Sequence, residues 1–543
     1  MAEAVSVELR GPRFVATHVT LIRPPVLTIP SSLSTHGPTP PVGLAYIAAT
    51  LREVGHRVSV VDAAGSGIEQ VSLVDSPVGP LQRRGLAPAE VVERIPADTE
   101  LIGITLMFVH EWPQTRELLD AIRQRFPEVP IVVGGETATS FWKWMFEQTD
   151  AIDYVVLGEG EATILELVDC LSSGASVAGL PGVVARDPSR EPLSGGLPRR
   201  MRQLHEVPRP AWDLFPLEDY FRHPFFGVDR GRSMPLLATR GCPYKCSFCS
   251  SPQMWTTRYV VRDPDDVVDE IEAYVKEHSV RNINFCDLTA ITKRRWTLDF
   301  CDALDRRGLD ITWQIPVGTR AEALDEEVLR RLYETGCRNI VYAPESGSER
   351  MLRIFDKKVK LPHILTSLRV AHRVGLKTHV NIIIGHPEER WSDLAMSLRF
   401  LVKAALAGCD DCAPIMFCPY PGSADFERLV SDGRLVVDEA TCFIGLSRSS
   451  SAARSFNPRM SGRQLRIVQF ALLAVFYSLA TLRRPLRLVE FVRSQITGVE
   501  STYLDQMVRS IRQGRRSRRE GAARVGAAKI PDGGVPGGSV TSS

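Results

Sequence analysis

The sequence predicts an α/β fold made of two successive units and a helical C-terminal extension. In about residues 10–185, and again in about residues 233–425, short apolar runs alternate with helix-like stretches. That alternation is typical of parallel sheets covered by helices. The chain has 543 residues, enough for two or three domains with separate cores. We therefore expect a connector at 186–232, a helical region at 426–513 and a disordered tail at 514–543.

The first unit contains five strand candidates, with helix-like stretches between them. The strands are expected at 14–22, 56–62, 101–106, 130–133 and 154–157. Helices are expected at about 43–54, 113–126 and 161–171. This order predicts a Rossmann-like, doubly wound parallel sheet, in which ligands bind beyond the carboxyl ends of the strands.

Glycine-rich turns follow the last two of these strands. Gly134-Gly135-Glu136 follows the fourth strand, and Gly158-Glu159-Gly160-Glu161 follows the fifth. Bare backbone at these turns lets a large flat ligand come close. No G-x-G-x-x-G follows the first strand, so a dinucleotide is not favoured. The residues alone leave the ligand open.

The second unit repeats the strand–helix pattern six times. Its strands are expected at 235–239, 282–285, 311–315, 339–343, 379–384 and 413–417. The helices between them are expected to begin near Pro264, Arg294, Asp325, Leu361 and Trp391. Six units are too few for a complete eight-unit barrel, and active sites of such barrels lie at the carboxyl ends of the strands.

Three cysteines follow the first strand of this second unit. Cys242, Cys246 and Cys249 form a C-x3-C-x2-C array. A loop with this spacing can fold its thiolates around one iron–sulfur cluster, which usually takes four thiolates. Three thiolates leave one iron open to a substrate or cofactor. The alternative, three buried or unpaired thiols, is rare for short-spaced cysteines in a Gly-Cys-Pro context.

At this motif the sequence resembles the radical S-adenosylmethionine (SAM) superfamily, with Phe248 in the aromatic position of C-x3-C-x-aromatic-C. The resemblance implies a partial (β/α)6 TIM-type barrel and a 4Fe–4S cluster on the three cysteines. SAM would bind the open iron and be cleaved to methionine and a 5′-deoxyadenosyl radical. The residues expected to contact SAM lie in the cluster loop and at strand ends: Phe248, Asp287, Glu345, Ser346, Gly385 and Pro387. The alternative for Glu345 is an acid at a helix N-terminus.

The N-terminal unit resembles the cobalamin-binding domain that precedes many radical SAM domains. The similarity rests on Pro41-Val42-Gly43-Leu44-Ala45-Tyr46 and on the two glycine-rich turns. It implies cobalamin contacts from Gly43, Thr105, Gly134, Gly135, Glu136, Gly158, Glu159 and Gly160. The D-x-H-x-x-G motif, whose His ligates cobalt in many such domains, does not occur. That departure implies a displaced lower base and no protein His on cobalt. His36 and His110 lie near the expected ligand edge, but a lone loop His is more often solvated.

These resemblances imply a cobalamin-dependent radical SAM enzyme. We expect a C-methyltransferase that moves a methyl group from methylcobalamin to an unactivated carbon of a natural-product or lipid substrate, with a second SAM remethylating cobalt. A tetrapyrrole substrate also stays open. The alternative within enzymes is an oxidative cyclase or ring-rearranging enzyme that binds cobalamin without methyl transfer. A cobalamin or redox sensor is the alternative from another class. A methylthio-transferring enzyme is disfavoured, because the N-terminal unit contains only Cys170.

Composition limits the partners and the compartment. A net charge of +2 gives no push toward nucleic acid. Eleven mostly scattered cysteines and an N-terminus without a visible signal peptide favour the reducing cytoplasm. We expect a small-molecule substrate and an electron donor such as flavodoxin or ferredoxin. Cys409, Cys412 and Cys418 hint at a second cluster, although buried structural thiols are the default interpretation.

Residues 465–482 are strongly apolar but fall short of the ~20 residues that span a bilayer. A helix packed on the barrel is the default expectation. A membrane-surface helix that reaches a lipid substrate is the functional alternative. In the connector, an aromatic cluster of Tyr220, Phe221, Phe225 and Phe226 is expected to dock an ordered linker rather than to line the substrate cavity.

Overall fold

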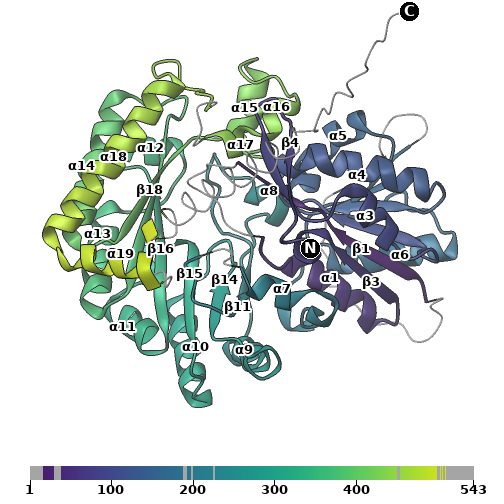
Figure 1. Ribbon diagram of the computed structural model, residues 1–543, viewed down its shortest axis with the longest axis horizontal. Helices are drawn as coiled ribbons and strands as arrows, with labels where there is room; N and C mark the ends of the chain where they lie inside the picture. The colour runs from purple at the N-terminus through teal and green to yellow at the C-terminus, as the bar shows by residue number, and fades with distance from the viewer. Residues whose placement is uncertain are drawn as a thin grey trace, which may run out of the picture.

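The computed structural model shows two α/β units side by side (Figure 1). It describes residues 16–29, 38–187, 193–196, 200–223, 227–448 and 453–497, together with residues 502, 504, 505 and 508. Several expectations lie outside these described residues: the start of the first strand at Phe14, His36, Phe225, Phe226 and the tail 514–543.

The N-terminal unit is a seven-stranded sheet in the order β10-β9-β8-β7-β6-β1-β3. Its parallel strands are β1 (His18–Arg23), β3 (Arg57–Asp62), β6 (Leu101–Thr105), β7 (Ile131–Gly134) and β8 (Tyr154–Val156). These correspond to the five expected strands, so the Rossmann-like fold is confirmed.

The sheet also has an antiparallel edge that the sequence did not predict. Strands β9 (Val183–Ala185) and β10 (Leu193–Ser194) continue the sheet in antiparallel fashion. An antiparallel edge strand is common on an otherwise parallel sheet. Strand β10 also lies in the segment that the sequence assigned to the connector, because its turn-rich composition hid a two-residue strand.

Both faces of this sheet are covered by helices. Leu21 and Ile22, adjacent on β1, face opposite sides and join different clusters of buried side chains. One face is covered by α1 (Val42–Glu53) and α6 (Glu161–Ser173). The other is covered by α3 (Pro88–Arg94), α4 (Trp112–Arg125) and α5 (Glu136–Gln148). A small antiparallel sheet of β2 (Val26–Thr28), β5 (Leu81–Arg84) and β4 (Val71–Val74), which the sequence did not predict, also belongs to this unit.

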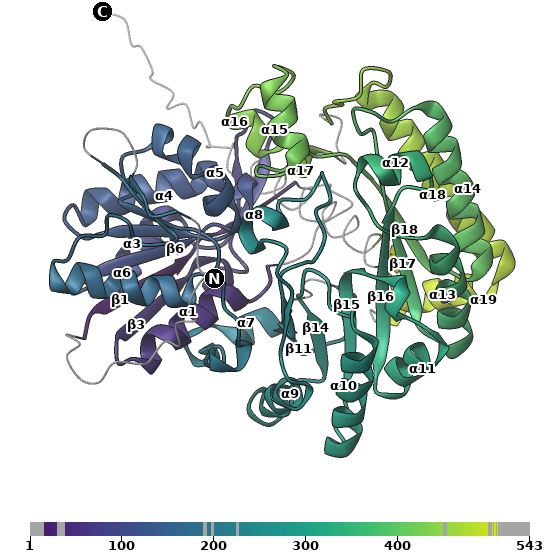
Figure 2. The ribbon, with the colours of Figure 1, turned by 180° about the vertical axis from the view of Figure 1, so that it is seen from behind.

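The second unit is a parallel six-stranded sheet whose strands follow one another in chain order. The strands are β11 (Ser233–Leu236), β14 (Asn282–Phe285), β15 (Thr312–Thr319), β16 (Cys337–Glu345), β17 (Lys377–Ile384) and β18 (Asp411–Met416). Figure 2 shows the helices outside this curved sheet. The expectation of an open, six-unit partial barrel is confirmed.

Helices between these strands begin close to where the sequence placed them. They are α9 (Pro264–His278), α10 (Arg294–Arg307), α11 (Glu326–Glu334), α13 (Leu361–Val374) and α14 (Trp391–Ala407). Asp263 and Asp325 cap α9 and α11 by accepting hydrogen bonds from backbone N–H groups of the first turn. Gly375 and Gly408 end α13 and α14 in the left-handed conformation, where glycine is favoured.

After β18 the chain forms α18 (Gly462–Arg483) and α19 (Leu486–Thr497). Helix α18 packs against α14 and β18, so the expectation of a helix on the barrel is confirmed. Its Gln469 is buried and donates a hydrogen bond to the Pro414 carbonyl at 2.7 Å. By length and composition alone, α18 is the one helix in the described part of the chain that could cross a membrane.

The connector docks through aromatic side chains, as expected. Tyr220 on α7 (Leu217–Phe221) is fully buried, and its hydroxyl donates to the Asp62 carboxylate at 2.9 Å. The indole N–H of Trp212 donates to the Tyr274 hydroxyl at 3.0 Å. These bonds link the connector to β3 on one side and to α9 on the other.

Candidate active site

A cavity of about 290 Å³ with an open mouth lies between the two units, at the carboxyl ends of their strands. All eight residues expected to contact cobalamin line it: Gly43, Thr105, Gly134, Gly135, Glu136, Gly158, Glu159 and Gly160. The second unit contributes Leu237, Thr239, Arg240, Gly241, Cys286 and Leu288, and α8 (Ser251–Trp255) contributes Met254 and Trp255. Residues of the two units, which are far apart in the sequence, therefore line the same cavity.

The glycines on the N-terminal side leave the cavity wall flat. A Cβ atom at Gly43 would have no neighbour within 4 Å, and one at Gly134 would come no closer than 3.8 Å to any atom. Such side chains would fill cavity space. Gly135 differs, because its φ of +110° and a Cβ position 2.6 Å from the Leu106 carbonyl oxygen require glycine. The wall fits a broad flat ligand such as cobalamin.

The two acids expected to contact cobalamin also bond to residues outside the N-terminal unit. Glu136, at the start of α5, accepts a hydrogen bond from the Ser250 hydroxyl, next to Cys249. Burial raises the pKa of its carboxyl. Glu159 accepts a backbone hydrogen bond from Met201 at 2.7 Å, and its side chain is 1% exposed. These bonds favour an interdomain role for both carboxylates.

Glu159, Glu161, Arg200 and Arg240 form what we call the interdomain cluster. Arg240 lies 2.6 Å from Glu161 and 3.4 Å from Glu159, and Arg200 lies 2.9 Å from Glu159. All four side chains are buried. Arg240 also stacks on the Tyr46 ring, 5.2 Å from its centroid. Because Arg240 ends β12 (Thr239–Arg240) two residues before Cys242, the cluster ties the cysteine loop to the N-terminal sheet.

The cysteine loop opens with a sharp turn. Gly241 has φ +84°, and a Cβ there would lie 2.0 Å from the Arg258 carbonyl oxygen. Cys242, Cys246 and Cys249 are half-buried free thiols. No three His, Cys, Asp or Glu side chains in the described ranges are gathered closely enough for a single metal ion. An iron–sulfur cluster is larger than a single ion and holds its thiolates farther apart. Cysteines too far apart for one ion can therefore still hold a cluster.

Two cations lie near Cys246 of this loop. Burial raises the pKa of Cys246 to about 11, whereas the positive charges of Lys357 and Arg320 act in the opposite direction. Arg320 stacks on Tyr244 of the same loop, 3.4 Å from its centroid. Nearby cations favour the thiolate form that binds iron.

Residues of two helices that follow barrel strands anchor the loop, Asp425 of α15 (Ala424–Ser431) and Phe355 at the end of α12 (Glu349–Ile354). The Ser247 hydroxyl donates to Asp425 at 2.9 Å, and Asp425 also lies 3.2 Å from the buried His386 after β17. Hydrogen bonds and charge from His386 and Ser247 lower the pKa of Asp425, against burial. Phe248 packs edge-on against Phe355, with ring centroids 5.3 Å apart.

Asp287 and Glu345, two of the residues expected to contact SAM, have partners within the chain. Asp287 is fully buried at the end of β14 and accepts hydrogen bonds from the Thr239 hydroxyl and backbone. Burial raises its pKa to about 6. These bonds favour a positioning role for Asp287. Glu345 has φ +68°, unusual for a non-glycine residue, and its carboxylate lies 3.0 Å from the Lys357 ammonium.

Three further expected SAM residues lie at the ends of β16 and β17. Ser346 is buried and accepts a hydrogen bond from the Ser348 backbone at 3.1 Å. Gly385 has φ +80°, and a Cβ there would lie 2.4 Å from Leu465 of α18. Pro387 is buried. The chain thus brings all the expected strand-end segments around one loop, as parallel strands require.

Of the two histidines considered for cobalt, His110 is not among the described residues that line the cavity. His36 lies outside the described residues. His110 stacks on Phe108, with centroids 5.5 Å apart, and burial lowers its pKa to about 3. From the same loop it is Met107 that lines the cavity.

Cys409, Cys412 and Cys418 are buried, and Cys418 lies beyond the far end of the strand that carries Cys412. Cys409 donates to the Asp411 carbonyl at 3.3 Å. Cys412 is near the start of β18 and Cys418 is beyond its end, so at about 3.3 Å per residue the strand keeps them about 13 Å or more apart. Three thiols so arranged cannot share one cluster.

Sequence reasoning missed several residues of the site. Arg240, Met254, Trp255, Cys286 and Leu288 all line the cavity. For three of them, the position in the sequence could have indicated a place in the site. Arg240 stands directly before the Gly-Cys turn, and Cys286 and Leu288 flank Asp287 at a strand end. Met254 and Trp255 follow the cysteines on a helix of five residues, too short for a periodic pattern.

Comparison with known proteins agrees with this architecture. The family model for the B12 binding domain matches residues 32–168, and that for the radical SAM superfamily matches residues 236–401. An uncharacterised methyltransferase of Pyrococcus horikoshii is 28% identical over 427 residues, which are 77% of this chain and 84% of the relative. An anaerobic magnesium-protoporphyrin IX monomethyl ester cyclase of Rubrivivax gelatinosus is 26% identical over 398 residues, 72% of this chain and 67% of the relative.

Among solved structures, the radical SAM methyltransferase TsrM from Kitasatospora setae, with cobalamin and a 4Fe–4S cluster bound, superposes with a TM-score of 0.63. The match covers 93% of this chain and all of TsrM at 17% identity, which establishes a common fold. Fold and site together define a radical SAM enzyme. The chain belongs to the radical SAM enzymes that carry an N-terminal B12-binding domain. The two matched domains are a B12-binding domain and a radical SAM domain, and the solved neighbours hold cobalamin with a 4Fe–4S cluster in TsrM and cobalamin with SAM in OxsB.

Proposed function

We propose that the protein is a cobalamin-dependent radical SAM C-methyltransferase that methylates an unactivated carbon of a small molecule. One observation carries the proposal. A single cavity is lined on one side by the glycine turns of the B12-binding domain and on the other by Arg240 and Gly241 of the cysteine loop. A substrate between them would face both cofactors. The relatives named as methyltransferases support this activity.

Each group of residues has a proposed role. Cys242, Cys246 and Cys249 hold the cluster, and the strand ends at Glu345 and Gly385 position SAM. The strained backbone of Glu345 is typical of residues that a site holds in place. When bound, these cofactors supply hydrogen abstraction from a substrate carbon and the methyl group that replaces the hydrogen. The protein aligns the partners and excludes water.

The barrel side of the cavity is mostly apolar. Leu237, Met254, Trp255 and Leu288 line it. Burial raises the pKa of Cys286 to about 12, so its thiol stays protonated and does not act as a nucleophile near neutral pH. An apolar, water-poor wall suits a substrate whose reacting carbon lies in a hydrocarbon part, such as a natural-product scaffold or a lipid.

The second candidate is an oxidative cyclase that binds cobalamin without transferring methyl. The anaerobic cyclase relatives support it, at 26% identity. The two candidates differ in their products. Methylation adds one methyl group to the substrate and releases S-adenosylhomocysteine, whereas cyclisation removes hydrogen and forms a ring.

The test is anaerobic reconstitution with iron, sulfide and hydroxocobalamin, followed by reduction in the presence of SAM. We expect both 5′-deoxyadenosine and S-adenosylhomocysteine. Cys249→Ala should abolish 5′-deoxyadenosine formation, and Cys170→Ser, a matched cysteine in the other unit, should not. 5′-Deoxyadenosine without S-adenosylhomocysteine, with cobalamin bound, would favour the cyclase.

The surroundings of the reaction are also proposals. We infer that a flavodoxin or ferredoxin supplies the electron and that the enzyme works in the cytoplasm, where free cysteines persist. We further propose residues 10–185 and 233–425 as the two functional domains. A peripheral membrane contact through residues 465–482 is a separate proposal, because it concerns a surface away from the cavity.

A further inference from the structure

The exposed side of α18 is apolar along its length. The helix contains no charged residue between Arg466 and Arg483. Its inward side packs on the barrel through Leu465, Leu472 and Phe476. Its outward side presents Ile467, Phe470, Val475 and Leu482, of which Ile467 is 63% and Leu482 is 78% exposed. A helix on the surface of a soluble domain normally presents charged residues there.

Helix α19 repeats this arrangement. Its exposed side presents Leu486, Leu488, Val489, Val492 and Ile496, and Ile496 is 80% exposed. We call these residues, with the four exposed apolar residues of α18, the outer face. Helices α18 and α19 contact each other, and large exposed apolar surfaces mark interaction sites.

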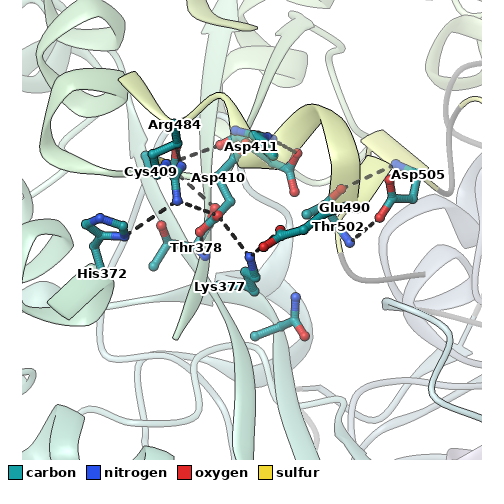
Figure 3. Close-up of polar contacts among 12 residues, drawn as sticks. His372, Lys377, Thr378, Cys409, Asp410, Asp411, Arg484, Glu490, Thr502 and Asp505 are labelled. Atoms are coloured by element: carbon teal, nitrogen blue, oxygen red, sulfur yellow. Dashed lines mark hydrogen bonds and ion pairs between the residues drawn. The ribbon is translucent and has the colours of Figure 1, made fainter. Parts of the chain in front are cut away.

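The polar side of α19 holds the helix against the barrel (Figure 3). Arg487 is buried and pairs with Asp411 at 3.2 Å, and Arg484 in the turn before α19 pairs with Asp410 at 3.0 Å. Glu490 pairs with Lys377 at 3.2 Å. These contacts fix which side of α19 faces outward, so its apolar exposure follows from the fold.

The charges beside the outer face are positive. On α18 and α19 these are Arg463, Arg466, Arg483 and Arg493, and the neighbouring helix α14 adds Arg399 and Lys403. None of these cations forms an ion pair with a described carboxylate. The carboxylates of the same three helices are engaged: Asp393 bonds to Arg350, and Glu490 bonds to Lys377.

We propose that the outer face of α18 and α19 docks on an anionic lipid bilayer. Apolar side chains would enter the boundary between headgroups and acyl chains, and the arginines would meet the lipid phosphates. The contact lies in the plane of the membrane surface. A spanning arrangement of α18 would require Leu465, Gln469 and Phe476 to leave the barrel. A second copy of this chain is disfavoured, because it would bring the same unpaired arginines together.

Vesicle co-sedimentation of the full-length protein tests this proposal without any catalytic assay. The probes are phosphatidylcholine vesicles with and without phosphatidylglycerol. We expect binding to the anionic vesicles at least about tenfold stronger than to the neutral ones, and weaker as salt is added. The double variant Ile467→Glu/Phe470→Glu should lower binding to anionic vesicles by about tenfold or more.

The matched control is Leu73→Glu/Val436→Glu, because both residues are 71% exposed and lie outside the outer face. That variant should bind vesicles as the unmodified protein does. The proposal is overturned if the full-length protein does not bind anionic vesicles, or if the α18 variant binds them unchanged. It is also overturned if sedimentation velocity shows a dimer that the α18 variant dissociates while vesicles are not bound. A chain truncated after Thr497 gives one further outcome. If it binds anionic vesicles and the full-length protein does not, the C-terminal residues, and not lipid, occupy the outer face of the full-length protein.

Discussion

Two buried groups of charges stabilise this protein in different places. The interdomain cluster, with Arg240 at its centre, joins the N-terminal sheet to the cysteine loop at the carboxyl ends of the strands. The second group, which we call the barrel-floor cluster, lies at the opposite ends of β17 and β18 (Figure 3). It joins Asp410, Asp411 and Lys377 to α18 and α19.

The difference between them shows how the protein uses buried charge. Burying ions costs free energy that apolar packing would not, so each group is expected where geometry matters more than stability. At the floor, the charges fix a helix onto a strand within one unit. At the carboxyl ends of the strands they fix the start of the cysteine loop against the N-terminal unit, which is the placement that the proposed function requires. Damage to the two clusters should therefore have different consequences.

The largest effect is expected from Arg240→Met. The change leaves Glu161 buried without its cation, and breaking a buried ion pair in this way costs about 3–5 kcal/mol. We expect a lower thermal midpoint and a lower amount of cobalamin retained after gel filtration, because the two units lose their tie beside the cavity. Thermal melting and the visible spectrum measure the two effects.

Arg294→Met is the matched control for this change. Arg294 pairs with Asp325 and Glu327 but is 48% exposed, and exposed pairs contribute only about 0–1 kcal/mol. Its thermal midpoint and cobalamin content should stay close to those of the unmodified protein. Full cobalamin retention by Arg240→Met would refute the positioning role of the interdomain cluster.

Arg484→Met should separate stability from cofactor binding. Asp410 would lose one charged hydrogen bond, worth about 1.5–3 kcal/mol, but would keep Lys377 at 3.7 Å. We expect a lower thermal midpoint with cobalamin and iron content unchanged. A loss of either cofactor would show that the floor also controls the site.

Substitutions at two adjacent glycines, Gly134 and Gly135, distinguish loss of stability from loss of cobalamin binding at the end of β7. Gly135→Ala forces a Cβ to 2.6 Å from the Leu106 carbonyl at φ +110°, a strain of roughly 1–3 kcal/mol. Gly134→Ala meets open space, so it should leave stability nearly unchanged and weaken cobalamin binding by filling the wall. Cobalamin titration and thermal melting distinguish them. Equal cobalamin affinity in Gly134→Ala and the unmodified protein would count against the flat wall as the cofactor site.

The smallest effect concerns pH. Burial raises the pKa of Glu389, after β17, from 4.5 to about 8. Because the folded pKa lies above the ordinary value, the protein loses stability as pH rises from 4.5 to about 8. Glu389→Gln keeps an acceptor for the Gly385 backbone and removes the titration. Its thermal midpoint should fall less than that of the unmodified protein between about pH 6 and pH 9. Parallel curves would contradict this assignment.

Local patterns predicted much of the fold and one wall of the site. The strands of both sheets follow from apolar runs bounded by turn residues, and one wall of the cavity follows from the glycine-rich turns after two strands, where bare backbone lets a ligand come close. The cysteine loop was predicted from its spacing and from the family resemblance. In each case the information lies within about ten residues of chain.

Partners distant in the sequence could not be predicted. The contact of Glu159 with Arg240 could not be predicted, because Arg240 is 81 residues away and becomes its neighbour only when the sheets meet. Asp287 likewise bonds to Thr239, 48 residues earlier. The antiparallel edge of β9 and β10 was missed because strands of two or three residues carry no readable period.

The central claim is that one chain holds cobalamin and an iron–sulfur cluster on opposite walls of one cavity. The most direct test is to reconstitute the protein anaerobically with iron, sulfide and hydroxocobalamin, remove unbound material by gel filtration, and measure cobalamin and iron per chain. The account predicts one cobalamin and about four irons per chain. Cys249→Ala should lose iron. Arg240→Met should lose cobalamin before it loses iron. A protein that retains the full cluster but no cobalamin would contradict it.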